Sequence, residues 1–496
     1  MSSYILGIDQ STQGTKALLF DSEGRLICRY DRSHQQLINE KGWVEHNALE
    51  IYENTLQVVK ELVEKSGIHK SEILAVGISN QRETAVAWDR KNGKPVFNAI
   101  VWQCSRGEEI CKRIEHQGGA QLIRSKTGLP ISPYFSAAKW AWILENIEEA
   151  KELEENGELC CGTMDSFLIY QLTHGKEFKT DYSNASRTQM FDIKKLCWDQ
   201  EICSLFGISE TCLAEVTDSN GYYGMTDFDG FLDQPIPIRG VMGDSHGALF
   251  GQGCLNNGMI KATYGTGSSV MMNIGADPVL SNSVVTSLAW GMDGTVSYVL
   301  EGNINYTGAV ITWMKDDLGI ISSPDETGNL AMEANEKDRT YLVPAFSGLG
   351  APYWDSNASA SVVGMTRMTK KAEFVKAGLE SIAFQITDVI KTMEKESEIQ
   401  IQELRVDGGP VKNSYLMQFQ SDMANIPVYV PKVEELSGIG AAYMAGIGTG
   451  LYEKESLFKK IDYQIYSPVM SETEQNDRYQ GWLSAVNKVL TNLSDL

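Results

Sequence analysis

The chain lacks the short motifs that mark several large classes of enzyme. No Gly-x-x-x-x-Gly-Lys-Ser/Thr sequence is present, which excludes a P-loop, and no Gly-x-Gly-x-x-Gly follows an apolar strand, which excludes a dinucleotide-binding fingerprint. No two histidines have the spacing of zinc ligands, and the segment that begins at Asp355 lacks the glycine of a calcium loop. No apolar run approaches the roughly 18 residues that a membrane-spanning helix needs.

Basic residues are scarce relative to acidic ones. The 496 residues include 43 Lys and Arg but 65 Asp and Glu, which gives a formal net charge of −22. A chain this acidic repels nucleic acid and anionic membranes over most of its surface, so we expect neither as a partner. Backbone N–H groups, a magnesium ion or a few well-placed cations can still bind an anion locally.

The cysteines indicate reduced thiols rather than disulfides. Their number is nine, which is odd, and no Cys-x-x-Cys motif occurs. The first residues, MSSYILGIDQ, have neither the basic segment nor the cleavage site of a secretory signal. Because disulfides persist mainly in oxidising compartments, this usage predicts a cytoplasmic protein.

The apolar pattern predicts an α/β protein with two similar halves. Strand-like segments flank the polar turn in GIDQSTQGTKALLF, and a second such turn occurs in TYGTGSSVMMNIG. Helical periodicity covers residues 49–65, 133–146 and 374–394, and residues 438–450 read as a helix of small side chains suited to close packing. We therefore expect two domains, residues 1–245 and 246–496, joined closely around a central cleft.

Three loops rich in glycine and hydroxyl groups are candidates for binding phosphate. GIDQSTQGTK can cradle phosphates through the N–H groups of its turn, with Asp9 near a magnesium ion and Lys16 close by. YGTGSS can do the same from the second half, and DGGP at the end of a strand would let a nucleotide approach the backbone. Each loop alone is typical of an ordinary turn, but together they suggest a nucleotide held between two lobes.

Asp244 is the most suggestive single residue. It lies in VMGDSHGALFG, between a glycine and a serine and ahead of a run of small apolar residues. A carboxylate in such surroundings is costly unless it is paired, bound to a metal or used in chemistry. Arg82 and Glu83, in NQRET between two apolar strands, are typical of a structural ion pair. Trp102 and Tyr134 are typical of core aromatics, so none of these four decides the function alone.

An apparent acyl-transfer signature is contradicted by the order of its parts. Ser136-Ala-Ala-Lys139 fits the Ser-x-x-Lys motif of acyl-serine hydrolases, and a Lys-Thr-Gly sequence occurs at residues 126–128. That companion motif precedes the serine here, whereas the known order places it last. We therefore expect no acyl-serine chemistry.

Several long blocks of the sequence resemble the FGGY family of carbohydrate kinases, and within it the glycerol kinases most closely. The similarity extends over nearly the full length. The blocks include GISNQRETAVAWDR (77–90), GLPISPYFSAAKWAWILEN (128–146), TDYSNASRTQMFDI (180–193), GDSHGALFGQ (243–252), PAFSGLGAPYWD (344–355) and RVDGGPVKNSYLMQFQSD (405–422). The resemblance implies a two-lobed, actin-like ATPase fold of duplicated ribonuclease-H-like domains, which close over ATP and an acceptor alcohol. Family members are often homodimers or homotetramers.

The resemblance also implies roles for the motif residues. The family transfers the γ-phosphoryl group of ATP to a terminal hydroxyl, and the aspartate of the Gly-Asp motif, here Asp244, would be the general base. Asp9 would help to hold Mg²⁺. The acceptor would contact Arg82, Glu83, Trp102, Tyr134, Asp244 and Ser245. ATP would contact Thr12, Gln13, Lys16, Thr266, Gly267, Gly308, Gly409 and Asn413.

Some positions depart from the usual glycerol kinase pattern. Ser245 stands where glutamine is usual, Ser269 where a phenylalanine packs on glycerol, and Cys104 where aspartate is usual. In the first phosphate loop, Gln13 replaces a common threonine and Lys16 a common arginine. Because the first two changes enlarge the acceptor pocket and add hydroxyls, our hypothesis is a polyol or ketose of four or five carbons rather than glycerol itself. A kinase specific for a pentulose or pentitol, such as xylulose or ribulose, is the alternative.

Two other functional classes share parts of this pattern. A non-catalytic, ATP-binding sugar sensor would be expected to lose Asp9 or Asp244, or to carry a fused DNA-binding helix-turn-helix. Both carboxylates are present, and the chain enters a strand almost at once. A chaperone-like ATPase without an acceptor would not need the predicted acceptor residues.

Overall fold

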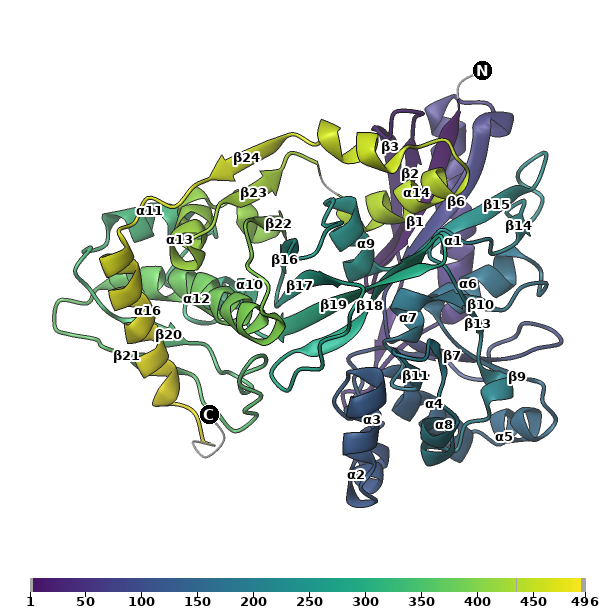
Figure 1. The fold of residues 1–496 in the computed structure, drawn as a ribbon, viewed down its shortest axis with the longest axis horizontal. Helices are drawn as coiled ribbons and strands as arrows, with labels where there is room; N and C mark the ends of the chain where they lie inside the picture. The colour runs from purple at the N-terminus through teal and green to yellow at the C-terminus, as the bar shows by residue number, and fades with distance from the viewer. Residues whose placement is uncertain (1–2, 434, 492–496) are drawn as a thin grey trace.

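The protein has two lobes, each built on a large mixed sheet, in a computed structural model that describes residues 3–433 and 435–491 (Figure 1). In both sheets three strands pair antiparallel, and two more strands then pair parallel to the first. The first sheet has the order β14 (Met225–Thr226), β15 (Ile236–Gly243), β6 (Ile73–Asn80), β1 (Tyr4–Gln10), β2 (Gly14–Phe20) and β3 (Leu26–Ser33). The second has the order β18 (Val285–Met292), β19 (Thr295–Ile304), β17 (Ser268–Gly275), β16 (Ile260–Tyr264), β22 (Leu404–Gly408), β23 (Val428–Pro431) and β24 (Tyr463–Tyr466). This repeat confirms the predicted two-lobed, actin-like fold.

A helix from the end of the chain covers the first sheet. α14 (Leu436–Gly448) packs against β1, β6 and β15 and against α9 (Asp244–Gly251), while α1 (Ala48–Ser66) packs against β2 and β3. The small residues predicted at 438–450 allow the helix to approach the sheet closely. The contact is so close that a Cβ on Gly77 of β6 or Gly240 of β15 would lie 2.2 or 2.3 Å from the carbonyl oxygen of Ala441 in the helix. Since α14 crosses to the first lobe, the domain boundary near residue 245 stays a prediction.

The second lobe is centred on one long helix. α12 (Lys371–Ser397) extends the predicted helix by a few residues at each end, and its buried face packs on β17 and β19 (Figure 1). Shorter helices surround it, namely α11 (Glu326–Glu333), α13 (Ser414–Ala424) and α16 (Glu472–Asn487).

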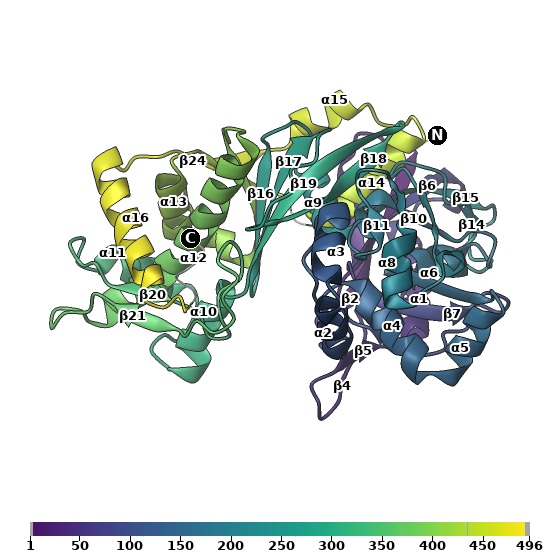
Figure 2. The ribbon, with the colours of Figure 1, turned by 60° about the horizontal axis from the view of Figure 1, so that its bottom comes forward.

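A smaller sheet is inserted into the first lobe. Its strands are β4 (Gln36–Ile38), β5 (Val44–His46), β8 (Ala99–Ile100), β7 (Ala85–Asp89) and β9 (Leu159–Thr163). Figures 1 and 2 show its helices at the end of the lobe away from α14; they are α2 (Glu108–His116), α3 (Gly119–Thr127), α4 (Ser136–Asn146), α5 (Glu148–Glu155) and α8 (Gln200–Phe206). The turn between β6 and β7 therefore joins the two sheets of the first lobe, and it carries Arg82 and Glu83.

Two further expectations have clear outcomes. All nine cysteines are free thiols, as predicted. Helix α4 begins at Ser136 rather than at residue 133. The reason is that the ammonium of Lys139 binds the carbonyls of residues 133–135, which holds this segment outside the helix. Within the described ranges, no helix combines the length and apolar character needed to cross a membrane.

Candidate active site

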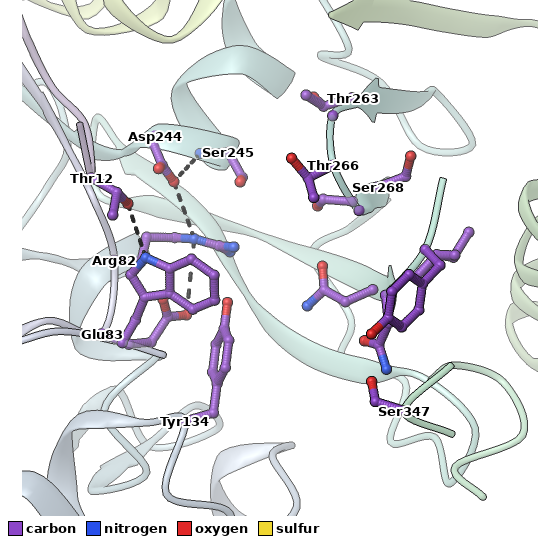
Figure 3. Close-up of a pocket in the computed structure, with 18 residues that line it drawn as sticks. Thr12, Arg82, Glu83, Tyr134, Asp244, Ser245, Thr263, Thr266, Ser268 and Ser347 are labelled. Atoms are coloured by element: carbon purple, nitrogen blue, oxygen red, sulfur yellow. Dashed lines mark hydrogen bonds and ion pairs between the residues drawn. The ribbon is translucent and has the colours of Figure 1, made fainter. Parts of the chain in front are cut away.

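Three adjoining cavities form a cleft between the lobes. The first, of about 610 Å³, is lined by the β6–β7 turn and the start of α9 on one side and by β17, β19 and the β16–β17 loop on the other (Figure 3). The second, of about 570 Å³, lies among α10 (Gly308–Thr312), α11 and α13, and the third, of about 590 Å³, lies beside β1 and the end of β22. Thr263 lines both the first and the third cavity, and Gly409 lines both the second and the third. The cleft is therefore continuous.

The predicted site residues are distributed along this cleft. The first cavity is lined by Thr12, Arg82, Glu83, Trp102, Tyr134, Asp244, Ser245, Thr266 and Gly267. The second is lined by Gly308, Gly409 and Asn413, and the third by Asp9, Lys16 and Gly409. Gln13 is exposed and lines none of these three cavities.

Asp244 is held at the junction of strand β15 and helix α9. It is the first residue of the helix, where a negative charge is favoured, and its Oδ1 accepts a hydrogen bond of 2.6 Å from the N–H of Ser245. The Nε of Arg82 lies 3.3 Å from the same oxygen (Figure 3). Among the described residues, Oδ2 has no hydrogen-bond partner, and 33% of the side chain is exposed. One carboxylate oxygen is thus oriented by the protein while the other is free to accept a proton.

A buried network of charges lies behind Asp244. Both terminal nitrogens of Arg82 donate to Glu301, at 2.9 Å each. Arg187 donates from its Nε to Glu83 at 2.6 Å, and its Nη1 lies 2.8 Å from Glu301. Burial alone would raise the pKa of Glu301, but Arg187 and Arg82 hold it well below its usual range. Both terminal nitrogens of Arg82 are therefore bound to Glu301, and only the Nε of Arg82 is left to contact Asp244.

Sequence reasoning missed Arg187 and Glu301. Glu301 is a single carboxylate in the apolar segment YVLEGNI and is fully buried. The argument that singled out Asp244, that a charge among apolar residues needs a partner, applies equally to Glu301. Glu83 shows a further sign of constraint, because its φ of 60° lies in the left-handed region that non-glycine residues seldom adopt.

The two predicted aromatic residues form one corner of the first cavity. The rings of Trp102 and Tyr134 lie 5.4 Å apart, and the indole N–H of Trp102 donates to Thr12 at 3.0 Å.

The carbonyl of Tyr134 is among those bound by Lys139, and burial lowers the pKa of this lysine to about 7. Ser136 donates instead to the carbonyl of Glu83, so Lys139 and Ser136 serve the backbone rather than acyl transfer.

Asp9 has the properties of a magnesium ligand. Its Oδ1 is buried and has no hydrogen-bond partner in the part of the chain that the structure describes, and Lys16 lies 4.0 Å from Oδ2. Burial raises the pKa of Asp9 to about 6; Lys16 opposes this, while Asp244 and Glu435 add to it. The described residues contain no cluster of three or more His, Cys, Asp or Glu side chains that could hold a metal. Mg²⁺ in phosphoryl-transfer sites commonly uses one or two carboxylates together with substrate phosphates, so a single carboxylate with one unpaired oxygen fits it.

In the glycine-rich segments, backbone without side chains lines the cleft. Gly408 has a φ of 98°, and a Cβ there would lie 1.9 Å from the carbonyl oxygen of Tyr264. A Cβ on Gly409 would meet nothing within 4 Å, so a ligand can approach this residue closely. Asn413 caps α13 through its Oδ1 and donates to Thr327 at 3.0 Å, so its side chain is already engaged.

Comparisons with known proteins agree on one family. Residues 4–251 match the N-terminal domain of the FGGY family of carbohydrate kinases, and residues 260–449 match its C-terminal domain. The chain is 48% identical over 491 residues to glycerol kinase 1 of Thermotoga maritima, with 98% of this chain and 100% of that protein covered. It is 46% identical to a glycerol kinase of Desulforamulus reducens, with 98% and 97% covered.

The solved structures give the same result. The crystal structure of Plasmodium falciparum glycerol kinase with ADP superposes with a TM-score of 0.93 at 33% identity, covering 99% of both chains. A ligand-bound xylulose kinase of Lactobacillus acidophilus superposes with a TM-score of 0.88 at 23% identity, covering 98% of both chains, which shows the shared fold alone. The fold, the cleft and these matches over almost the whole chain lead to one conclusion: the chain belongs to the FGGY family of carbohydrate kinases and is an ATP-dependent kinase with a sugar or polyol acceptor.

Proposed function

We propose that the protein transfers the γ-phosphoryl group of ATP to a terminal hydroxyl of glycerol or of a related, longer polyol or ketose, with Asp244 as the general base. The observation that carries this proposal is the position of Asp244, whose Oδ2 has no partner among the described residues and which lines the same cavity as the Gly265–Gly267 loop. An alcohol is a weak nucleophile at neutral pH. A carboxylate that takes its proton as the P–O bond forms typically contributes a factor of about 10²–10⁴.

The surrounding residues would position the acceptor and stabilise charge. Arg82 and the N–H of Ser245 hold Oδ1 of Asp244, so Oδ2 keeps a fixed direction toward the reacting hydroxyl. Trp102 and Tyr134 would cover the carbon skeleton, while Glu83 would accept hydrogen bonds from hydroxyls. The backbone N–H groups of Thr266 and Gly267 would stabilise the transferred phosphoryl group from the second lobe.

The third cavity would receive the triphosphate and its metal. Asp9 would hold Mg²⁺, which neutralises phosphate charge during transfer. Lys16 lines the same cavity and would approach the phosphates, and the second cavity, with Gly308, Gly409 and Asn413, would take the nucleoside.

The predicted homodimer or homotetramer and the predicted cytoplasmic location stay expectations from the sequence.

The names of the relatives support glycerol as the reference acceptor. A non-catalytic sugar sensor is less well supported, because both Asp9 and Asp244 are present and one oxygen of each has no protein partner among the described residues. Coupled detection of ADP release from ATP and Mg²⁺, with and without a panel of polyols and ketoses, tests the proposal. We expect release that depends on an acceptor. Equal release with and without every acceptor would contradict it and favour an ATPase without an acceptor.

A further inference from the structure

The wall that the second lobe gives to the first cavity carries polar side chains that have no hydrogen-bond partner among the described residues. Asn303 and Asn305 both line this cavity, and within residues 3–433 and 435–491 neither side-chain amide makes a hydrogen bond. Ser347, on the same side of the cavity, likewise has no side-chain partner there (Figure 3). Polar groups that line a cavity without protein partners bind water or a polar ligand, so this wall is suited to hydroxyl groups.

These side chains continue a row that starts at the charge network. Alternate residues of a strand share one face, so Glu301 and Asn303 point the same way from β19, toward the first lobe that Glu301 contacts through Arg82. Asn305 follows directly after the strand and lines the same cavity. Positions two residues apart are separated by roughly 7 Å. The row therefore runs from the carboxylate that anchors Arg82 to two unengaged amides farther along the cavity.

Ser269 leaves the space beside this row open. It is the antiparallel partner of Asn303, so the two side chains lie on the same face of the sheet. Its side chain lines the cavity but is short, and its hydroxyl donates to Glu301 at 3.1 Å, which holds it against the charge network. A phenylalanine, usual at this position in the glycerol kinases that the sequence resembles, would project a ring into the space next to Asn303. With serine, an acceptor can extend from Asp244 to the amides.

The charges of the cavity favour a neutral acceptor. Its charged lining residues are Arg82, Glu83 and Asp244, and the terminal nitrogens of Arg82 are already bound to Glu301. No cation of the lining is left to pair with a carboxylate or phosphate of an acceptor. A sugar acid would place its negative charge among carboxylates, which is unfavourable.

We propose that the preferred acceptor is a neutral, open-chain polyol or ketose of four or five carbons, whose reacting hydroxyl lies at Asp244 and whose distal hydroxyls bind the amides of Asn303 and Asn305. This inference rests on the proposed kinase function. It adds two specificity-determining residues and a chemical class of acceptor to that function.

The test compares kcat/KM for glycerol, erythritol, xylitol, xylulose, ribulose and gluconate in the wild type and in single variants. We expect a four- or five-carbon neutral acceptor to exceed glycerol, and gluconate to be inactive. Asn303→Ala and Asn305→Ala should each lower kcat/KM for the preferred acceptor by about 10–100-fold, the usual effect of losing a hydrogen bond to a substrate hydroxyl. For glycerol the loss should stay within about threefold, and KM for ATP should not change. Asn256→Ala, which removes an exposed amide whose side chain has no hydrogen-bond partner among the described residues, is the matched control.

Ser269→Phe tests the same inference in the opposite direction. The ring should lower kcat/KM for the longer acceptor and raise it for glycerol, reversing the preference. Glycerol as the best acceptor of the wild type would overturn the inference while leaving the kinase function intact. A rise in KM for ATP in the asparagine variants, with no change for any acceptor, would also overturn it and assign the amides to the triphosphate. Absence of ADP release with every acceptor would refute the kinase function itself.

Discussion

Two carboxylates occupy matching places in the two lobes but have different surroundings. Asp244 begins the helix after β15, and Glu435 precedes the helix after β23, each at the last parallel strand of its repeat; the two helices, α9 and α14, pack on each other. Glu435 is 7% exposed and pairs with Lys16 and Arg29, whereas Asp244 is 33% exposed and one of its oxygens has no partner within the described ranges. The nearest cation of Asp244, Arg82, is occupied by Glu301. Whether such a carboxylate can act as a base thus depends on whether the neighbouring cations pair with it or with another carboxylate.

Removal of the free carboxylate should have the largest effect. We expect Asp244→Asn to lower kcat by about 10²–10⁴-fold, because the amide cannot take the proton of the acceptor. The affinity for ATP should remain within about threefold, since the second cavity, where we propose that the nucleoside binds, is lined by other residues. Steady-state rates and ATP titration by calorimetry measure the two quantities. Turnover within about tenfold of the wild type would show that Asp244 is not the base.

Glu301→Gln should make Asp244 resemble Glu435. Without the buried charge of Glu301, Arg82 can turn its guanidinium to Asp244, and a carboxylate paired with a cation accepts a proton less readily. Loss of one partner of a buried ion pair also lowers the free energy of unfolding by about 3–5 kcal/mol. Urea denaturation and kcat measurements on the same preparation check both effects. A variant with normal stability and normal kcat would show that Arg82 does not depend on Glu301.

Asp9 should make stability depend on pH, because burial and, to a smaller extent, the charges of Asp244 and Glu435 raise its pKa. Its folded-state pKa of about 6 exceeds the ordinary value of 3.8. Its contribution to stability is therefore fully present below about pH 4 and is lost as the pH rises through about 6. Without Mg²⁺, Asp9→Asn should be more stable than the wild type above pH 7, by up to about 3 kcal/mol, and the difference should shrink at lower pH. Added Mg²⁺ together with ATP should stabilise the wild type more than Asp9→Asn.

Urea denaturation across pH 4–8 in EDTA, repeated with Mg²⁺ and ATP, measures these differences. Other buried carboxyls with raised pKa values, such as Asp165 and Asp388, are the same in both proteins and cancel in the comparison. Parallel pH profiles for the wild type and Asp9→Asn would contradict the raised pKa of Asp9.

Glu435→Gln should have the smallest effect. Lys16 and Arg29 are 33% and 47% exposed, so solvent screens the pairs, and we expect a loss of stability of about 1 kcal/mol or less. The kcat should change by less than about threefold, because Glu435 is not a proton acceptor in the proposed reaction. Asp462→Asn, which breaks an exposed pair with Lys432, is the control. A loss of kcat as large as that of Asp244→Asn would contradict the proposal that Asp244, and not Glu435, takes part in the reaction.

The sequence could predict those parts of the site that depend on local pattern or on motif. The strand–turn–strand segments, the small-residue helix and three residues that line the first cavity, Arg82, Glu83 and Asp244, were all accessible in this way, because each lies in a continuous block of sequence. Arg187 and Glu301 were not. Glu301 pairs with Arg82 across 219 positions, and Arg187 pairs with Glu83 across 104, so no local pattern relates them.

By itself the sequence determined the alternation of strands and helices, the glycines that allow close approach, and the acidic balance of the chain, because these follow from neighbouring residues and composition. Only the tertiary structure decided which carboxylates are neutralised and which oxygen remains free. The reason is physical: the energy of a charge depends on its distance from other charges and on the water around it. Both are fixed only when distant segments, such as β6, α9 and β19, come together at one cavity.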